Sequence, residues 1–435
     1  MKELLSIEKE ILSNISVDKT WSFAEKTIKD TTYITHGYYT YPAKFIPQLA
    51  SRLINELSKE NDIVIDPFMG SGTTAVESIV NKRIGIGTDI NNIAYLLSKV
   101  KTTPIKPILL MEELNRIEFD LQNRLNGQFC FYLDRTKDLI KPNERIDYWF
   151  FPEQRDKLAI IFTRILEITN NDVRDFFLIA FAQILKSCSI WLQKSVKPTR
   201  DKNKKIYEPL TLFLNQLKKM IRKHYDFDKI LDTKVKEEIN TFRIVQCADA
   251  RNLPCENEKA SLIITSPPYV TSYEYADLHQ LPSLWFGYLN ELSEFRKKFI
   301  GSAYKERESV DLKSSLAEEI FSLLGNNKKG REVKNYFADM LESFIEMKRV
   351  LKKGGKACIV IGNTQFKGVK ILNAEVFQEQ FENIGFRTFN IIHREIPSKM
   401  LPSTRDISSG QFVKSTKSEL KLAYPTEYIL IMEKL

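Results

Sequence analysis

The chain has 435 residues, of which 43% are hydrophobic and 28% are charged, as is typical of a globular protein. Its net charge of +9 at pH 7 favours an anionic partner such as nucleic acid. Five cysteines without a CxxC pair and four histidines without metal-ligand spacing argue against a disulfide framework and a zinc site, so we expect a cytoplasmic protein without a metal. No apolar run is long enough to indicate a membrane span, and the opening "MKELLSIEKEILSNIS" is typical of an amphipathic helix rather than a signal peptide.

The first hundred residues contain a strand, a glycine-rich loop, a helix and a second strand, in that order. Residues 1–30 are predicted to form a helical lead-in, and helical spacing resumes at 46–57. The run "DIVID" is predicted to be a buried strand that ends in Asp66, and "RIGIGTDI" a second strand that ends next to Asp89. This order is typical of the opening of a doubly wound parallel α/β sheet.

The pattern becomes purely helical between residues 101 and 240, and the α/β alternation then returns. The helical region contains four segments with apolar residues at helical spacing, at 112–125, 152–169, 172–195 and 208–225. The later strands are predicted at 242–250, 260–265, 356–363, 386–396 and 426–434. We expect a helix over 337–355 that closes at Gly354 and Gly355, and charged, irregular chain at 290–335. The region 101–240 is therefore interpreted as a helical insertion in an α/β protein.

The segment "DPFMGSGTT" has the features of a ligand-binding turn. Glycines at 70 and 72 allow the backbone to approach a ligand closely, and the following helix offers free N–H groups to a carboxylate or a phosphate. The segment lacks the lysine of a phosphate-binding P-loop, whereas Asp66 can accept hydrogen bonds from an ammonium group. An amino-acid-like ligand satisfies both features.

Two further acids end neighbouring strands of the predicted sheet. Asp89 stands where an acid usually binds the ribose hydroxyls of a nucleoside cofactor, and Asp249 can accept a hydrogen bond from an adenine amino group. Because the carboxyl ends of parallel strands meet at one edge of a sheet, we expect Asp66, Asp89 and Asp249 to converge on one crevice.

The run "SPPY" at 266–269 ends another buried strand, "SLIIT". Together, "DPFMGSGTT" and "SPPY" resemble the S-adenosylmethionine-dependent DNA amino-methyltransferases of restriction–modification systems. "HGYYTYPAKFIP" is similar to the segment of that family that covers the methionine end of the cofactor, and "VLKKGGKACIVIGN" is similar to its later helix–strand turn. The resemblance implies a Rossmann-like class I methyltransferase fold with a mixed sheet, the cofactor S-adenosylmethionine and a double-stranded DNA substrate.

The resemblance also implies a role for each residue of the run. Acceptors at Ser266 and Pro267 hold the hydrogens of an exocyclic amino group, the rings of Pro267 and Pro268 keep these acceptors rigid, and Tyr269 stacks on a base flipped out of the duplex. No covalent intermediate is needed, because alignment of the amino nitrogen with the methyl group suffices. The cofactor-binding residues that the resemblance implies are Lys44, Phe45, Asp66, Phe68, Gly70, Ser71, Gly72, Thr73, Asp89, Ile90, Asp249 and Ala250.

The first letter of "SPPY" bears on the target base. In the family that the chain resembles, serine at this place goes mostly with N4 of cytosine, and aspartate or asparagine mostly with N6 of adenine. We therefore expect N4-cytosine methylation, with N6-adenine as the alternative. Carbon-5 methylation requires a cysteine nucleophile, and Cys255 precedes the strand that such a loop should follow, so we interpret this cysteine as incidental.

Basic loops are the candidates for DNA contact. The run "WLQKSVKPTRDKNKKIY" contains Lys194, Lys197 and Arg200, together with further lysines up to Lys205. A second candidate is the loop at 398–415 with Lys399 and Arg405, and a third is 290–335, which includes "KKGREVK". We divide the chain into residues 1–100, 101–240 and 241–435, and we expect the middle part to be a target-recognition or clamp region.

Several alternatives share the same features. An RNA amino-methyltransferase has the same cofactor loop, and a non-catalytic DNA-binding protein on a degenerate methyltransferase fold is the rival without activity. A modification enzyme implies a cognate restriction endonuclease as a separate chain, and we expect a monomer or a dimer.

Overall fold

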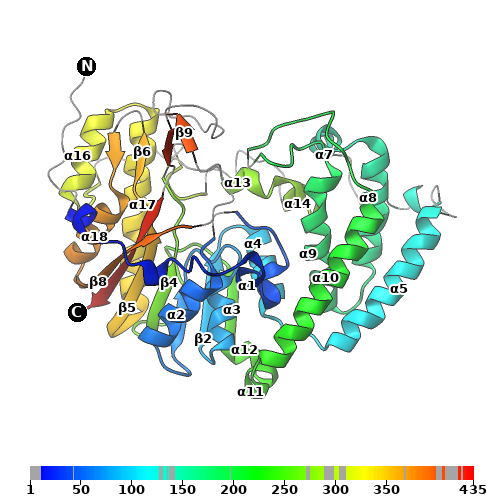
Figure 1. Cartoon of the computed structure of the whole chain (residues 1–435), viewed down its shortest axis with the longest axis horizontal. Coiled ribbons are helices and arrows are strands. Elements are labelled where there is room, and N and C mark those ends of the chain that lie inside the picture. Colours follow the sequence, from blue (N-terminus) through cyan, green and yellow to red (C-terminus); the bar gives the residue numbers. More distant parts are fainter. Residues whose placement is uncertain are drawn as a thin grey trace.

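A seven-stranded mixed sheet runs through the protein in a computed structural model (Figure 1). The structure describes residues 11–42, 44–126, 131–134, 136, 143–195, 197–270, 275–288, 298–302, 310–366, 369–397, 404–406, 420–422 and 425–435. The strands of the sheet are β1 Ile63–Asp66, β2 Ile84–Asp89, β3 Arg243–Cys247, β4 Ala260–Thr265, β5 Leu351–Ile361, β8 Phe386–Glu395 and β11 Thr426–Lys434. Two small sheets pair β6 Thr364–Phe366 with β7 Val369–Ile371 and β9 Thr404–Asp406 with β10 Leu420–Leu422.

The strand order of the large sheet is β3-β2-β1-β4-β5-β11-β8. The first five of these strands pair in parallel, and β11 lies antiparallel between β5 and β8. The order reverses direction between β1 and β4, because the chain moves outward to β2 and β3 on one side and to β5 on the other. Such a switch point leaves a crevice outside the carboxyl ends of β1 and β4, which is where open α/β sheets bind ligands.

Alternate residues of the strands bury on opposite faces of the sheet, as the two-residue period of a strand dictates. Val64 packs with Leu49 and Leu53 of a helix on one face, whereas Ile65 packs with the core on the other face that includes Phe344 and Phe377. Figure 1 shows the sheet between these helical layers. The helices of the two layers are α2 Pro47–Leu57, α3 Thr73–Val80, α4 Asn92–Thr102, α12 Ile239–Phe242, α16 Ser315–Leu324, α17 Lys328–Val350 and α18 Asn373–Asn383.

A group of helices between β2 and β3 lies to one side of the sheet and is called the helical unit below (Figure 1). Its members are α5 Pro107–Asn126, α7 Glu144–Trp149, α8 Pro152–Leu166, α9 Asn171–Cys188, α10 Pro209–Ile230 and α11 Thr233–Glu237. Apolar residues of α5, α8, α9 and α10 form one core with α4 and with α14 Gln280–Trp285. These helices fall within residues 101–240, where a helical insertion was expected, and the α/β fold class is confirmed.

The segment before α2 docks on the helical unit as well as on the sheet. The Tyr38 hydroxyl and His224 Nδ1 are 2.8 Å apart, and Gln216 Nε2 donates to the Tyr38 carbonyl at 2.7 Å. The backbone N–H of Thr40 donates to Gln183 Oε1 at 2.8 Å. Helices α9 and α10 therefore hold residues 38–40 directly.

Three expectations about elements are wrong. The lead-in is not one helix over its described part, because residues 11–30 contain only the short turns Ile11–Asn14 and Lys19–Trp21 and the start of α1 Ile28–Thr31. Between these turns, Asp18 donates its N–H to the His393 carbonyl at 2.8 Å, so the chain extends along the edge strand β8 instead of coiling.

The other two corrections concern residues 290–355. Helix α17 ends at Val350 rather than at Gly354 and Gly355. Both glycines lie within β5, where the register of this strand against β4 shifts. Gly354 has φ +74° and forms an exposed bulge. Residues 290–335 are not all irregular, because α16 and the first two turns of α17 lie there. Ser314 caps α16 by accepting from the Ala317 N–H at 3.0 Å. Among the described residues, no helix combines the length and the apolar character needed to cross a bilayer.

Candidate active site

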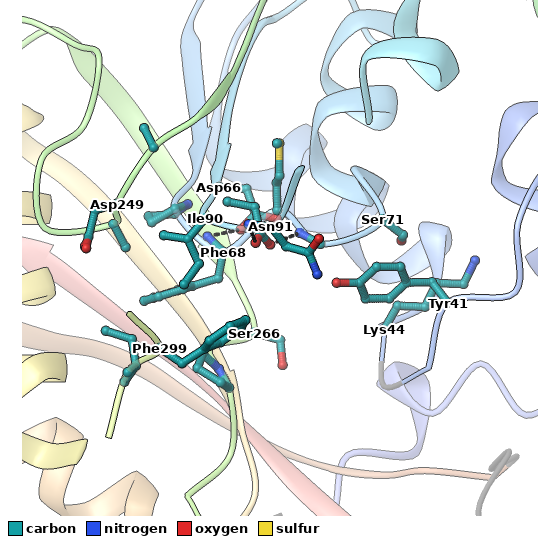
Figure 2. Close-up of a pocket in the computed structure, with 18 of the residues that line it drawn as sticks. Tyr41, Lys44, Asp66, Phe68, Ser71, Ile90, Asn91, Asp249, Ser266 and Phe299 are labelled. Atoms are coloured by element: carbon teal, nitrogen blue, oxygen red, sulfur yellow. Dashed lines mark hydrogen bonds between the residues drawn. The ribbon is translucent and has the colours of Figure 1, made fainter. Parts of the chain in front are cut away.

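The ends of β1, β2, β3 and β4 surround one pocket at the switch point of the sheet (Figure 2). It encloses about 900 Å³ of space including its open mouth, within the range of roughly 300–1,000 Å³ usual for ligand clefts. Of the expected cofactor residues, all except Gly72 line it, together with Ser266 and Pro268 of the expected catalytic run. Its lining residues are Tyr41, Lys44, Phe45, Asp66, Pro67, Phe68, Met69, Gly70, Ser71, Thr73, Asp89, Ile90, Asn91, Ala248, Asp249, Ala250, Ser266, Pro268, Lys298, Phe299 and Ile300.

The glycine-rich loop between β1 and α3 needs its glycines for two different reasons. Gly72 has φ +71° and precedes the first residue of α3, and a Cβ on it would lie 2.6 Å from Ser98 Oγ. Gly70 has φ +45°, and a Cβ on it would lie 3.2 Å from the Tyr41 ring. Both positions therefore exclude an ordinary side chain, so the loop packs tightly while the N-terminus of α3 faces the pocket. Gly72 does not line the pocket; it forms the turn into α3 behind the lining residues.

Asp66 is buried at the centre of the pocket and is held by three donors. Its Oδ1 accepts from Thr265 Oγ1 at 2.6 Å and from the Phe68 N–H at 3.1 Å, and its Oδ2 accepts from Thr74 Oγ1 at 2.8 Å. Burial raises the pKa of Asp66 to about 6, although these hydrogen bonds pull it down.

Asp89 is a second acid of the pocket, and two backbone N–H groups donate to it. Its oxygens accept from the Gly70 N–H at 3.0 Å and from the Asn91 N–H at 2.9 Å. Burial raises the pKa of Asp89 to about 6 as well. Within the described ranges, neither Asp66 nor Asp89 forms a salt bridge. The two carboxylates therefore make this pocket favourable for a cationic ligand.

Asp249 also lines the pocket but has a cationic neighbour. Arg251 donates to its two oxygens, from Nε at 2.8 Å to Oδ1 and from Nη2 at 2.6 Å to Oδ2. The third nitrogen of the same guanidinium, Nη1, donates to Asp339 Oδ1 at 3.0 Å. The Arg251 backbone N–H also donates to Oδ1, at 3.0 Å, so Arg251 fixes the position of the Asp249 carboxylate in the pocket wall.

The "SPPY" run begins where β4 ends, since Thr265 is the last residue of that strand. Ser266 and Pro268 face the pocket, whereas Pro267 is buried behind them. The Tyr269 hydroxyl donates to Glu427 Oε2 at 3.2 Å, and Glu427 Oε1 accepts from Arg394 Nη1 at 2.5 Å. The tyrosine is therefore anchored to strands β11 and β8, next to the pocket rather than in its wall.

The far end of the pocket is covered by the segment before α2. Lys44 Nζ donates to the His36 carbonyl at 3.1 Å, and burial lowers the pKa of Lys44 to about 8. Tyr41 packs on the His279 ring with centroids 4.7 Å apart. Figure 2 shows Tyr41, Lys44 and Ser71 at one end of the pocket and Asp249 at the other, with Ser266 between them.

Eight lining residues that the sequence did not single out as ligands complete the wall: Tyr41, Pro67, Met69, Asn91, Ala248, Lys298, Phe299 and Ile300. Tyr41 lies in the segment "HGYYTYPAKFIP", and Asn91 follows Asp89 by two residues, so a sequence signal lies next to each of them. Residues 298–300 come from charged chain without periodicity, which gave no signal.

The expected DNA-contacting residues divide into two groups. Lys194, Lys197 and Arg200 are exposed on a loop closed by an antiparallel bridge between Trp191 and Arg200. Lys204 of the same basic run is instead partly buried. Its Nζ donates to the carbonyls of Lys186, Ser189 and Trp191, and the Trp191 bond is 2.7 Å long. This lysine fixes the base of the loop.

The structure says little about the other segments that were expected to contact DNA. Arg405 lies in β9, whose backbone alone is described, and Lys399 lies outside the described residues. The segment 328–334 is the start of α17. Trp191 is buried and stacks on Trp149 with centroids 5.1 Å apart, so it belongs to the core. Across the described part of the chain, no cluster of three or more acidic, histidine or cysteine side chains could hold a metal ion.

Three features together define a Rossmann-like methyltransferase fold. The sheet is mixed, with one antiparallel strand near its edge; an acid-lined pocket lies at its switch point; and the Ser-Pro-Pro-Tyr loop contributes to the wall of that pocket. The model of the DNA methylase family N6_N4_Mtase matches residues 6–99 and 260–435, which leaves out the whole helical unit and β3. The chain belongs to this DNA methylase family and is a DNA methyltransferase.

Individual relatives extend the similarity across the helical unit. The chain is 27% identical over 399 residues to the Type II methyltransferase M.MvaI of Kocuria varians, covering 86% of this chain and 87% of the relative. It is 23% identical over 460 residues to the Type II methyltransferase M.MjaII of Methanocaldococcus jannaschii, covering 86% and 78% of the two chains. It is also 23% identical over 454 residues to the Type II methyltransferase M.BsoBI of Geobacillus stearothermophilus, covering 89% and 86%.

Proposed function

We propose that this DNA methyltransferase transfers a methyl group from S-adenosylmethionine to the N4 amino group of a cytosine in a short sequence of duplex DNA. The observation that carries the proposal is that Ser266 and Pro268 share one pocket with Asp66 and Asp89. A base-holding loop and a cofactor cradle must adjoin if the amino nitrogen is to be aligned with a methyl donor. The serine at the first position of "SPPY" favours cytosine N4 over adenine N6.

The pocket fits S-adenosylmethionine on two structural grounds. Asp66 and Asp89 are two buried carboxylates whose ionised forms a cationic ligand would stabilise, and the glycine-rich loop lines the same pocket with Gly70, Ser71 and Thr73. In this assignment, Asp66 and the N-terminus of α3 hold the amino-acid part of the cofactor, with Lys44 near its carboxylate. Asp89 accepts from the ribose hydroxyls, and Asp249 accepts from the adenine amino group.

The chain's own residues then position the target base. When bound, S-adenosylmethionine supplies an electrophilic methyl group on a sulfonium. Ser266 Oγ and the Pro267 carbonyl accept the hydrogens of the exocyclic amino group, and the proline rings keep both acceptors in place. Tyr269, anchored by Glu427, supplies an aromatic face for the flipped base.

The proposal is tested by incubating the purified protein with S-adenosylmethionine and unmethylated genomic DNA, and by analysing the digested nucleosides by mass spectrometry. N4-methylcytosine is the expected product. N6-methyladenine would keep the fold and the mechanism but overturn the choice of base. If only structured RNA became methylated, the DNA substrate would be wrong.

Cofactor binding should release protons below neutral pH. A cationic ligand lowers the pKa of Asp66 and Asp89 from about 6, so ligand binding is favoured by their ionised forms. We therefore expect the affinity for S-adenosylmethionine to rise between about pH 5 and pH 7, with proton release near pH 6 that fades by pH 8. Calorimetry at each pH, in two buffers of different ionisation enthalpy, measures both quantities. Proton uptake at pH 6 would contradict this assignment of the two acids.

We also propose that the middle part of the chain, residues 101–240, contacts DNA through the loop of Lys194, Lys197 and Arg200. The loop stands on a fixed base, and the Arg200 guanidinium lies 4.0 Å from the centre of the Tyr148 ring. Exposed cations beside an aromatic ring suit a phosphate backbone. The biological role that fits relatives named Type II methyltransferases is modification of host DNA in the cytoplasm, with a restriction endonuclease as a separate partner.

Removing Lys194 and Lys197 should weaken DNA binding independently of sequence. Each phosphate contact contributes about 0.9 to the slope of log affinity against log salt concentration, so Lys194→Gln/Lys197→Gln should flatten that slope by roughly 2. Fluorescence anisotropy with specific and random duplexes at several salt concentrations measures the slope. The matched control is Lys229→Gln/Lys234→Gln, which removes the same charge at the end of α10 and in α11, at the opposite end of the helical unit (Figure 1). Equal flattening in both double variants would remove the assignment of this loop.

A further inference from the structure

A short piece of chain that is remote from the recognised motifs closes one side of the pocket. Lys298, Phe299 and Ile300 line the cavity, although they follow Ser266 by more than thirty residues. Figure 2 shows Phe299 on the side of the pocket where Asp249, Ile90 and Phe68 lie, away from Tyr41 and Lys44. An aromatic, an acidic and an aliphatic side chain therefore line the same end of the site.

The segment 298–302 is fastened to helix α17. The Gly301 N–H donates to Asp339 Oδ2 at 2.9 Å, and Asn335 Nδ2 donates to the Ser302 carbonyl at 3.1 Å. Gly301 has φ +72°, and a Cβ on it would lie 3.0 Å from the Cβ of Tyr336. The backbone thus rests directly on the helix, which leaves Phe299 little freedom to shift.

Asp339 connects this segment to the opposite wall. Its side chain is 0% exposed; Oδ2 accepts from Gly301, and Oδ1 accepts from Arg251 Nη1 at 3.0 Å. Arg251 in turn grips both oxygens of Asp249. Burying a carboxylate costs free energy unless the charge is paired, so breaking the contacts of Asp339 with Arg251 and Gly301 would be unfavourable. Asp249 and Phe299 are therefore placed by one shared group.

An acid and an aromatic ring at one end of a pocket recognise a planar heterocycle with an exocyclic amino group: the ring gives a stacking face, and the acid accepts from the amino group. We propose that Phe299 is a binding residue for the purine ring of the cofactor, and that Asp339 is the positioning residue that sets Phe299 and Asp249 relative to each other. This inference rests on the proposed use of S-adenosylmethionine, and it adds two residues that lie outside the recognised motifs.

The first test is the affinity of the full-length chain for S-adenosylhomocysteine, measured by calorimetry. Phe299→Ala should weaken binding by about 5- to 100-fold, as loss of base stacking does elsewhere. If the unsubstituted protein itself does not bind S-adenosylhomocysteine, the proposed function fails. If it binds and Phe299→Ala binds equally well, the present inference alone is overturned.

The second test asks whether Asp339 acts through these two walls. In an Asp339→Asn background, Phe299→Ala should cost little further affinity, because the ring is no longer held in place. The same background should also lose the preference for S-adenosylhomocysteine over its inosine analogue, which lacks the exocyclic amino group that Asp249 accepts from. A general loss of stability does not produce either effect. Fully additive losses with an unchanged preference would overturn the positioning role.

Two further variants keep this test decisive. Glu342→Gln removes another carboxylate that lies 3.6 Å from Arg251 on the same helix, but it leaves the bond from Gly301 to Asp339 intact. It should therefore preserve both the effect of Phe299→Ala and the preference for the amino-bearing ligand. If Asp339→Asn does not fold, Arg251→Lys takes its place in the same cycle, because lysine keeps the charge but cannot bridge Asp249 and Asp339 as the guanidinium does.

Discussion

Replacing Ser266 by alanine is expected to lower the rate of methyl transfer about 100- to 1,000-fold, the usual cost of removing one hydrogen-bonding group that acts on the reacting atoms. The affinity for S-adenosylmethionine should change little, because the acids that hold the cofactor in our proposal are Asp66 and Asp89. Single-turnover methylation of a duplex with one target site, at saturating cofactor and DNA, measures the rate of the chemical step.

The comparison with Tyr269 separates positioning of the amino group from stacking on the base. Tyr269→Phe removes only the hydroxyl that donates to Glu427, so it should reduce the rate less than Ser266→Ala does. A duplex with 2-aminopurine next to the target base reports flipping, and flipping should persist in Ser266→Ala. Unchanged single-turnover rates in Ser266→Ala would show that the amino group is held elsewhere.

The second large effect is expected at Asp66, where one substitution should have opposite consequences for stability and for binding. Asp66→Asn removes a buried charge, so the ligand-free protein should become more stable at pH 7, by up to about 3 kcal/mol for a pKa raised from 3.8 to about 6. Thr74 Oγ1 can donate to the Ile264 carbonyl, 3.2 Å away, and accept from the new amide. The affinity for S-adenosylmethionine should meanwhile fall about 10- to 100-fold, because a charged hydrogen bond is lost.

The pH dependence fixes the sign of this prediction. An acid whose pKa is raised by folding binds more protons in the folded state, so stability falls as pH rises from about 4 to about 6. The advantage of Asp66→Asn should therefore be absent near pH 3 and complete above pH 7, as thermal unfolding at several pH values would reveal. Asp62 lies immediately before the same strand and provides the control. Its pKa is lowered, since hydrogen bonds from Ser261 and Lys59 outweigh the desolvation that opposes them, so Asp62→Asn should destabilise the protein at pH 7.

How well the sequence predicted the site depends on which residues the covalent chain places next to a strong signal. Asp66, Asp89 and Ser266 follow apolar strands directly, and the parallel sheet brings such strand ends together whatever the length of the intervening insertion. Gly70 and Gly72 were readable because only glycine tolerates their backbone angles without strain. Short sequence signals were therefore sufficient to predict the residues that the strand ends contribute to the pocket.

The rest of the site depends on contacts between distant segments, which a single sequence does not display. Phe299 follows no strand, and its segment is held on α17 by contacts such as the bond from Gly301 to Asp339, which joins residues 38 positions apart. Gly354 and Gly355 carry the usual signal for a helix end, but pairing of Leu351 with Ala260 starts the strand earlier and places both glycines in a bulge. In these places tertiary pairing overrides local preference.

The docking of residues 38–40 on α9 and α10 limits how such enzymes can be recombined. Tyr38 is completely buried against the helical unit, whereas Tyr41, three residues later, lines the pocket at the switch point of the sheet. A chimaera that exchanged the helical unit alone would leave the Tyr38 hydroxyl without His224 and the N–H of Thr40 without Gln183. Two separate segments must therefore be exchanged together. A donor's helices have to be transferred with the donor's own short segment before α2, because otherwise the wall of the pocket that this segment forms loses its support.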